Sequence, residues 1–229
     1  VAYSGMERFF PADKIIMTGN PVRQNLLENQ TSQEEARQSF GLEPDKKTVL
    51  IVGGSLGART VNESVLAHLD DIRKSNVQFI WQTGKYYSQS ISEALEKSEA
   101  VPNLKVMDFI GCMDYAYAAA DLVVSRAGAS SISELCLLGK PCVLVPSPNV
   151  AEDHQTQNAL ALSSKDAAIF VADKEAKEKL VQTALETVTN DERLLSLSEN
   201  VKKLAFLNSS DIIAEEVYKL SVEYKKRNN

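Results

Sequence analysis

Short apolar runs alternate with amphipathic segments over residues 1–172 of the chain. The apolar runs are rich in Val, Ile and Leu and show little strict alternation, which is typical of parallel strands buried on both faces. This pattern predicts seven strands, which are Lys14–Thr18, Thr48–Val52, Gln78–Gln82, Leu104–Asp108, Leu122–Ser125, Cys142–Val145 and Ala168–Val171.

The segments between these runs carry helix signals. Ser32 and Glu35 have the spacing of a capping box, which marks a helix start, and Gly41 marks the end of that helix. Further helices are predicted at Ala58–Lys74, Tyr86–Lys97, Asp114–Ala120, Ser130–Leu138 and Gln155–Ser164. Regular alternation of strands and helices predicts an α/β fold with a doubly wound parallel, Rossmann-like sheet.

The pattern changes after Val171. Lys174–Asn190, Asp191–Asn208 and Ser210–Lys226 are predicted as consecutive helices with no strand between them. We therefore expect residues 1–172 to form the Rossmann-like core and residues 173–229 a helical tail. The last helix has an apolar stripe, so we expect it to pack across the sheet or onto something outside this chain; the stripe consists of Ile212, Ile213, Val217, Leu220 and Tyr224.

Composition narrows the classes of function. The formal net charge of -6 disfavours a protein that binds duplex nucleic acid, although a small basic pocket for a phosphate remains possible. Cys112, Cys136 and Cys142 are an odd number without metal-ligand spacing, and we interpret them as reduced thiols of a cytoplasmic protein. With two histidines and no Asp-x-Asp motif, no zinc or other protein-held divalent metal is expected.

A glycine-rich turn joins a predicted strand to a predicted helix at Val52–Ala58. Such a turn lets backbone N–H groups approach a phosphate at the positive end of the helix dipole, and Ser55 would add a hydroxyl donor. A P-loop is excluded because Ala58-Arg59 stands in place of Lys-Ser/Thr, and the next strand lacks the acidic residue of a dinucleotide site. Two alternatives remain: a turn that needs glycine only for packing, and a hydrolase.

The hydrolase alternative rests on a motif match. Gly53–Gly57 fits G-x-S-x-G, the nucleophile elbow of serine hydrolases, between a strand and a helix. Ser55, an acid such as Asp121, and His154 would then form the triad in the expected chain order. Few strands precede the turn, which weakens this interpretation.

A second strand-to-helix connection runs from Ser125 to Glu134. Its small residues would leave the N–H groups of Ala129, Ser130 and Ser131 pointing at an anion, and Glu134 would reach a ribose diol. The alternative is a capping box of Ser131 and Glu134 that only starts a helix.

Two weaker candidates also follow predicted strands. The segment Pro146–Asn158 is dense in carboxylates and amides, which suits sugar hydroxyls but also suits a solvated loop. Arg23 follows the first apolar run, where its guanidinium could bind a diphosphate.

Taken together, the motifs resemble the MurG glycosyltransferases. The matching stretches are GMERFFP…TGNPVR, GGSLGA, SRAGASSISEL, GKPCVLVPSP and EDHQTQNA, in that family's order over about residues 5–172. The resemblance implies the C-terminal half of a GT-B glycosyltransferase, which transfers N-acetylglucosamine from UDP-N-acetylglucosamine to lipid I and so forms lipid II in peptidoglycan synthesis. It further implies an inverting reaction without metal or cofactor, at the cytoplasmic face of the bacterial membrane.

The resemblance also implies roles for individual residues. Arg23 and Ser55 would contact the diphosphate, the backbone of Ile110 would pair with uracil, Glu134 would bind the ribose, and Gln155 the N-acetylglucosamine. The N–H groups around the phosphates would come from Ala129, Ser130, Ser131, Ile132 and Ser133. Many members carry Thr where this chain has Ser131, which keeps the hydroxyl. The catalytic base, the lipid I site and the membrane contact would belong to an absent N-terminal half, so this chain alone is expected to bind donor without transfer.

Overall fold

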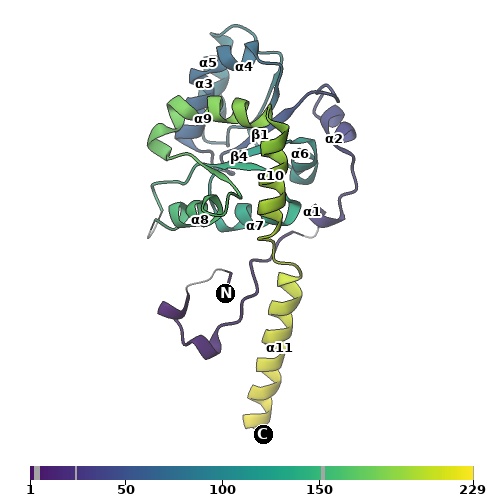
Figure 1. Ribbon diagram of the computed structural model, residues 1–229, viewed down its shortest axis with the longest axis vertical. Helices are drawn as coiled ribbons and strands as arrows, with labels where there is room; N and C mark the ends of the chain where they lie inside the picture. The colour runs from purple at the N-terminus through teal and green to yellow at the C-terminus, as the bar shows by residue number, and fades with distance from the viewer. Residues whose placement is uncertain (3–5, 24, 151–152, 229) are drawn as a thin grey trace.

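Six parallel strands form one sheet in the computed structural model, which describes residues 1–2, 6–23, 25–150 and 153–228. The strand order is β3-β2-β1-β4-β5-β6, the doubly wound order of a Rossmann fold. The neighbouring strands β1 and β4 lie in the middle of the body (Figure 1). The strands are β1 (Thr48–Val52), β2 (Gln78–Gln82), β3 (Leu104–Met107), β4 (Leu122–Ser125), β5 (Cys142–Leu144) and β6 (Ile169–Phe170). All the predicted strands after the first are therefore confirmed, and the fold class with them.

The predicted strand Lys14–Thr18 is wrong. Ala12–Lys14 is a turn of 3-10 helix (η2), and the chain then runs without regular structure to Arg23. The N–H of Thr18 donates to the carbonyl of Val1 at 2.9 Å, and Ile16 is 46% exposed. An apolar run becomes a strand only where a neighbouring strand takes its backbone hydrogen bonds, and the six-stranded sheet offers no such neighbour here.

Most of the predicted helices are present with some changed boundaries, and the short helix α1 (Asn25–Glu28) is an addition. The others are α2 (Gln33–Ser39), α3 (Arg59–Ala67), α4 (Leu69–Lys74), α5 (Ser88–Glu96), α6 (Met113–Ala119), α7 (Ala129–Leu138), α8 (His154–Ser163), α9 (Asp173–Val188), α10 (Asp191–Lys202) and α11 (Ser209–Asn228), with a further 3-10 turn, η1, at Met6–Arg8. The capping box of Ser32 and Glu35 is confirmed. The single helix predicted at Ala58–Lys74 is wrong, because His68 leaves helical geometry, with φ −122° and ψ 27°, and separates α3 from α4. The helix predicted at Asp191–Asn208 ends at Lys202.

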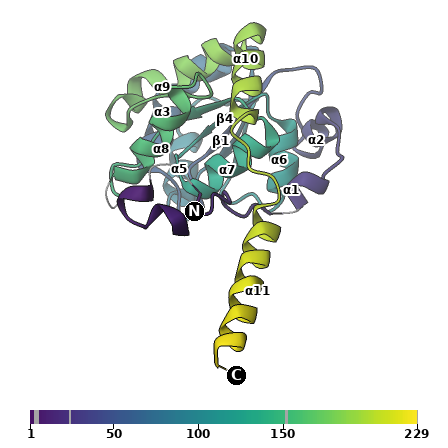
Figure 2. The ribbon, with the colours of Figure 1, turned by 60° about the horizontal axis from the view of Figure 1, so that its bottom comes forward.

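Helices cover both faces of the sheet in two layers (Figure 2). Val49 and Ile51 of β1 join one apolar cluster with α3, α4, α5 and α9, whereas Leu50 joins the other with α2, α6, α7 and α8. Successive strand residues point to opposite faces, so both faces of β1 are buried. Burial of both faces explains why the strands are continuous apolar runs in the sequence.

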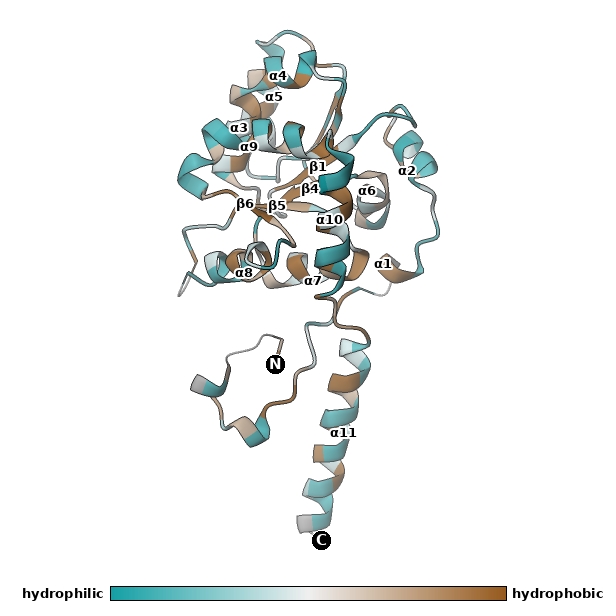
Figure 3. Cartoon of the chain, viewed as in Figure 1, coloured by the Kyte–Doolittle hydropathy of each residue, from teal (hydrophilic) through white to brown (hydrophobic). Residues whose placement is uncertain are grey.

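Helix α11 extends away from the two layers (Figures 1 and 3). Val217, Leu220 and Tyr224 of its apolar stripe are 61–70% exposed. None of the helices in the described part of the chain is long and apolar enough to cross a membrane.

Candidate functional site

The carboxyl ends of β1 and β4 mark the topological switch point of the sheet. These strands are neighbours, but the chain continues from β1 towards β2 and from β4 towards β5, so their following loops diverge. Ligands of open α/β sheets bind in the crevice that such divergence leaves. A cavity of about 640 Å³ lies there, lined by the glycine-rich turn, the start of α3, Arg126, the segment Ser147–Asn149, Gln155 and Asp173.

The glycine-rich turn needs its glycines for two different reasons. Gly57 has a φ of +90°, and a Cβ added there would lie 2.3 Å from the carbonyl oxygen of Thr83. Gly54 has a φ of +87°, but no atom lies within 4 Å of the corresponding Cβ position. Ser55, next in the chain, is exposed. Packing therefore explains Gly57, whereas Gly54 and Ser55 border open space that a ligand can occupy.

The start of α7 presents a second set of backbone donors. The helix begins at Ala129, and its first internal hydrogen bond runs from Ile132 N–H to the carbonyl of Gly128. The preceding N–H groups, of Ala129, Ser130 and Ser131, have no acceptor within the helix and so face its N-terminal end, where anions bind. No side chain caps this helix, so the capping-box interpretation of Ser131 and Glu134 is wrong.

The carboxylate of Glu134 instead contacts two residues from other elements. Nη2 and Nε of Arg23 lie 3.0 Å and 3.1 Å from its Oε1. The hydroxyl of Tyr117, on α6, donates to Oε2 at 2.9 Å. Burial, together with the nearby carboxylate, raises the pKa of Tyr117 far above its ordinary value, so this hydroxyl stays protonated. The structure thus brings together Arg23 and Glu134, two predicted site residues.

Ser133 lies beside this cluster. Its hydroxyl accepts a hydrogen bond from Nδ2 of Asn20 at 3.1 Å and donates to the carbonyl of Ala129 at 2.9 Å. The segment that carries Arg23 is therefore tied to α7 at two points.

The remaining predicted residues also follow strands. Oε1 of Gln155 accepts a hydrogen bond from Ser147 N–H at 2.9 Å, which fixes the amide at the edge of the cavity. Ile110 is 1% exposed, and its N–H faces Oε1 of Gln82 at 3.4 Å. Nδ2 of Asn158 donates to the carbonyl of Ala127, so this member of the polar run supports the loop before α7. Gly5, Ala151 and Glu152, which belong to the matching stretches or the polar run, lie outside the described residues.

Sequence reasoning missed three residues that shape the site. Nε2 of Gln82 donates to the carbonyl of Gly54 at 3.0 Å, which links the glycine-rich turn to the loop of Ile110. Arg126 donates to the carbonyls of Val145 and Pro146 and forms an ion pair with Asp173 at the cavity. Arg126 lies inside the stretch SRAGASSISEL and could have been singled out there; nothing local in the sequence marks Asp173.

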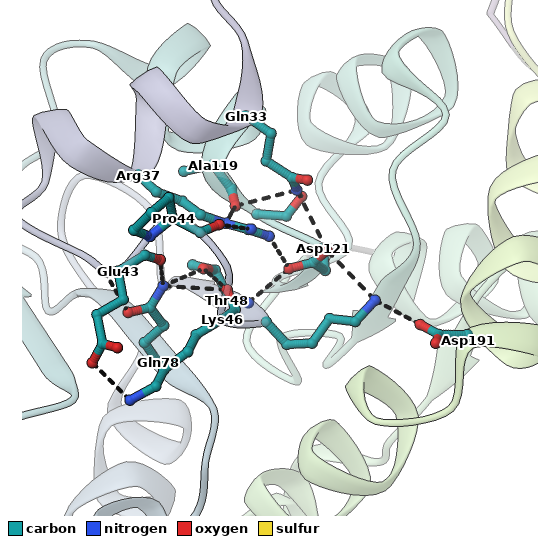
Figure 4. A network of polar contacts seen from close by, with 12 residues as sticks. Gln33, Arg37, Glu43, Pro44, Lys46, Thr48, Gln78, Ala119, Asp121 and Asp191 are labelled. Carbon is teal, nitrogen blue, oxygen red and sulfur yellow. Dashed lines mark hydrogen bonds and ion pairs between the residues drawn. The ribbon is translucent and has the colours of Figure 1, made fainter.

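The serine-hydrolase interpretation is wrong. Ser55 lies beyond the carboxyl end of β1, whereas Asp121 lies before β4, at the amino edge of the same parallel sheet. There Oδ2 of Asp121 accepts hydrogen bonds from Arg37 at 2.6 Å and from the N–H of Thr48 at 2.7 Å (Figure 4). The length of a strand separates the acid from Ser55, so the two cannot share a triad.

Comparison with known proteins agrees with this fold. The family model described as the glycosyltransferase family 28 C-terminal domain matches residues 48–215. The chain belongs to this family. It is 63% identical over 222 residues to the UDP-N-acetylglucosamine--N-acetylmuramyl-(pentapeptide) pyrophosphoryl-undecaprenol N-acetylglucosamine transferase of Bacteroides fragilis, covering 96% of this chain and 58% of that protein. The protein of the same name from Phocaeicola vulgatus is 60% identical, with 100% of this chain and 61% of that protein covered.

A solved structure of this family has the same fold. The crystal structure of Acinetobacter baumannii MurG matches with a TM-score of 0.70 and 27% identity, over 92% of this chain and 58% of that chain. The resemblance to the MurG glycosyltransferases is thereby confirmed, and the sheet is that of a GT-B C-terminal domain. The chain spans about three fifths of the length of these curated relatives.

Proposed function

We propose that this chain binds UDP-N-acetylglucosamine and forms the donor-binding half of an N-acetylglucosaminyltransferase of peptidoglycan synthesis. The observation that carries the proposal is that α3 and α7 begin just after the neighbouring strands β1 and β4, so both helices present their N-terminal N–H groups at the carboxyl edge of the sheet, at its switch point. Backbone N–H groups and helix dipoles at such a point favour a diphosphate. The names of the relatives indicate which nucleotide sugar it belongs to.

Each part of the donor has a matching element in this proposal. The diphosphate contacts Ser55, Arg23 and the N–H groups of Ala129, Ser130 and Ser131, while the uracil pairs with the backbone of Ile110. The N–H of Ile132, which the resemblance also assigns to the phosphates, instead donates to the carbonyl of Gly128 within the helix. Glu134 accepts hydrogen bonds from the ribose hydroxyls. Gln155, fixed by Ser147 at the cavity edge, binds the hydroxyls of the N-acetylglucosamine.

The proposed reaction is a direct displacement that inverts the anomeric carbon. A hydroxyl of the acceptor sugar attacks that carbon from the face opposite UDP, the bond to the diphosphate oxygen breaks, and a base takes the hydroxyl proton. The negative charge that develops on UDP is stabilised by N–H groups and the dipole of α7, which are already oriented before the reaction. We propose no metal or cofactor for this step.

The acceptor side of the reaction is assigned to the remaining two fifths of the relatives' length. In this proposal the acceptor is lipid I, and the protein works at the cytoplasmic face of the membrane as a peripheral enzyme. The base, the lipid I site and the membrane contact then lie outside the 229 residues of this chain.

Calorimetry and thermal unfolding with a nucleotide panel test donor binding. UDP-N-acetylglucosamine at a hundred times its Kd should add about 2.7 kcal/mol to the free energy of unfolding, and NAD at the same concentration should add nothing. Glu134→Ala should weaken UDP binding by about 1.5–3 kcal/mol, the cost of losing hydrogen bonds to a charged group.

The matched control is Glu93→Ala, which removes an exposed carboxylate on α5, away from the site. It should leave UDP binding unchanged. Stabilisation by NAD but not by UDP-N-acetylglucosamine would contradict the proposed function.

A further inference from the structure

The two oxygens of the Glu134 carboxylate are held by partners of very different character. Oε1 accepts a hydrogen bond from Nε of Arg23 and forms an ion pair with its Nη2, whereas Oε2 accepts the hydrogen bond from Tyr117. The side chain of Arg23 is 51% exposed, whereas Tyr117 is 5% exposed. One oxygen therefore faces a cation in contact with solvent, and the other faces a buried neutral donor.

Arg23 can leave this contact without losing water, because its side chain is half-exposed and stays solvated. The Glu134 side chain is only 12% exposed, so after the exchange its charge depends on the hydrogen bond from Tyr117 and on a new donor at Oε1. The segment of Arg23 has no regular structure, so the side chain can turn towards another anion without breaking a helix or strand. A diphosphate bound at the start of α7 carries more negative charge than one carboxylate and attracts the guanidinium more strongly.

Tyr117 cannot move in the same way. Its ring belongs to the apolar cluster that contains Ala116, Ile132 and Leu135, between α6, α7 and the sheet. Moving it would open a cavity, and its raised pKa keeps the hydroxyl protonated at neutral pH. The contact to Oε2 therefore persists when the contact to Oε1 is exchanged.

We propose that Tyr117 is a positioning residue for recognition of the nucleotide ribose. It holds Oε2 of Glu134 while Arg23 leaves Oε1 for the diphosphate, and the released Oε1 then accepts a ribose hydroxyl. The proposal rests on the proposed function, because it takes the site to be one for a ribonucleoside diphosphate. The fixed carboxylate keeps its direction when its charge partner is removed, so the ribose meets an oriented acceptor.

The test compares UDP with 2′,3′-dideoxy-UDP, which lacks both ribose hydroxyls, by calorimetry on the wild type and on Tyr117→Phe. The wild type should bind UDP at least about tenfold more tightly than the dideoxy compound, as expected for a hydrogen bond to a charged acceptor. Tyr117→Phe should reduce this ratio several-fold and leave the affinity for the dideoxy compound unchanged. Tyr115→Phe is the control, since it removes a more exposed hydroxyl from the same helix and should keep the wild-type ratio.

Each outcome separates this inference from the proposed function. An unchanged ratio in Tyr117→Phe, or an equal loss of affinity for both nucleotides, would overturn the positioning role while UDP binding still supports the function. Equal binding of the two nucleotides by the wild type would overturn the role of Glu134 and that of Tyr117 with it. Absence of UDP binding would overturn the proposed function itself. If Tyr117→Phe fails to fold, the same measurement is made on Tyr117→Met. Methionine also lacks a hydrogen-bond donor, and its flexible side chain adapts to irregular space.

Discussion

Two polar residues that follow strands are constrained in different ways by their neighbours. Glu134 has both carboxylate oxygens engaged by side chains from other elements, and in the proposed site a ribose hydroxyl takes the place of Arg23 at Oε1. Gln155 has its carbonyl oxygen engaged by the backbone N–H of Ser147, which fixes the amide without any exchange. At the scale of single residues, the contact of Glu134 with Arg23 is one that a ribose replaces in the proposed site. The contact of Gln155 with Ser147 sets the direction of the amide NH2 group.

Gln155→Ala should reduce discrimination between sugars. A fixed amide pairs with hydroxyls in one configuration only, so the inverted hydroxyl of UDP-N-acetylgalactosamine leaves a polar group unpaired at a cost of about 1–3 kcal/mol. The wild type should therefore prefer UDP-N-acetylglucosamine by about tenfold or more, and the variant should lose most of this preference while its affinity for UDP stays nearly unchanged. A competition titration of both sugars measures this. Equal preference before and after the substitution would place the sugar contact elsewhere.

Lys140 should make stability depend on pH in the alkaline range. Burial lowers its pKa to about 8 from an ordinary value of 10.5, against the opposing effect of Asp121, and its Nζ donates to the carbonyl of Ala120. Between these two values the unfolded state binds more protons than the folded state, so this residue makes the folded state more stable as pH rises. The stability of the wild type relative to Lys140→Met should increase between pH 7 and 10.5, by up to about 3 kcal/mol.

Urea unfolding at several pH values measures that difference. Lys202→Met, which removes an exposed lysine of α10, is the matched control. A pH-independent difference for Lys140→Met would show that the lysine keeps its ordinary pKa in the folded protein.

At the scale of elements, the connection from β1 to α3 is the part of the site that depends most on backbone geometry. Gly57 lies directly against the strand end at Thr83, and this close approach lets α3 start beside β2. Gly54 has a similar φ but faces open space. Substitution of Gly54 therefore measures the cost of backbone strain alone, whereas substitution of Gly57 measures that strain together with steric overlap.

Gly57→Ala should destabilise the fold more than Gly54→Ala. Gly54→Ala adds only the strain of a positive φ, about 1–2 kcal/mol. Gly57→Ala adds that strain and also an overlap with the carbonyl of Thr83, which together should cost about 2–5 kcal/mol. Denaturant unfolding of both variants tests the order. Equal losses of stability would mean that the turn relaxes freely around a methyl group at residue 57.

At the scale of the whole molecule, the described chain has a crevice at one edge of the sheet and one helix, α11, several of whose apolar side chains are exposed. The crevice lies at the carboxyl edge of the sheet, and α11 leaves the body with Val217, Tyr218 and Leu220 exposed (Figure 3). The relatives are longer than this chain by about two fifths of their own length. In the proposed function, this chain binds the donor, and transfer also needs the remaining part of the relatives' length.

This chain alone should bind UDP-N-acetylglucosamine but should not transfer the sugar. The displacement needs an acceptor held in line with the anomeric carbon and a base for its proton, and neither is assigned to these residues. Incubation with labelled donor and a lipid I analogue measures transfer, with the full-length Bacteroides fragilis transferase as the positive control. Turnover by this chain would show that the assignment of the acceptor side is wrong.

The local pattern of the sequence determines the alternation of strands and helices. Buried parallel strands must be apolar on both faces, so Thr48–Val52 and Gln78–Gln82 can be recognised from their residues alone. The capping box of Ser32 and Glu35 is likewise a contact between near neighbours. The sequence also predicts that the site residues lie at one edge of the sheet. All the strands are parallel, so the residues that follow them all lie at the carboxyl edge.

Only the tertiary structure decides which distant residues meet. Arg23 and Glu134 are 111 positions apart, and neither their contact nor the hydroxyl of Tyr117 between α6 and α7 has any local signal. The same holds for Lys14–Thr18, whose apolar residues fit a strand but find no partner in the sheet. Such contacts depend on how whole elements pack, since a backbone hydrogen bond or an ion pair forms only when packing brings both groups within about 3 Å.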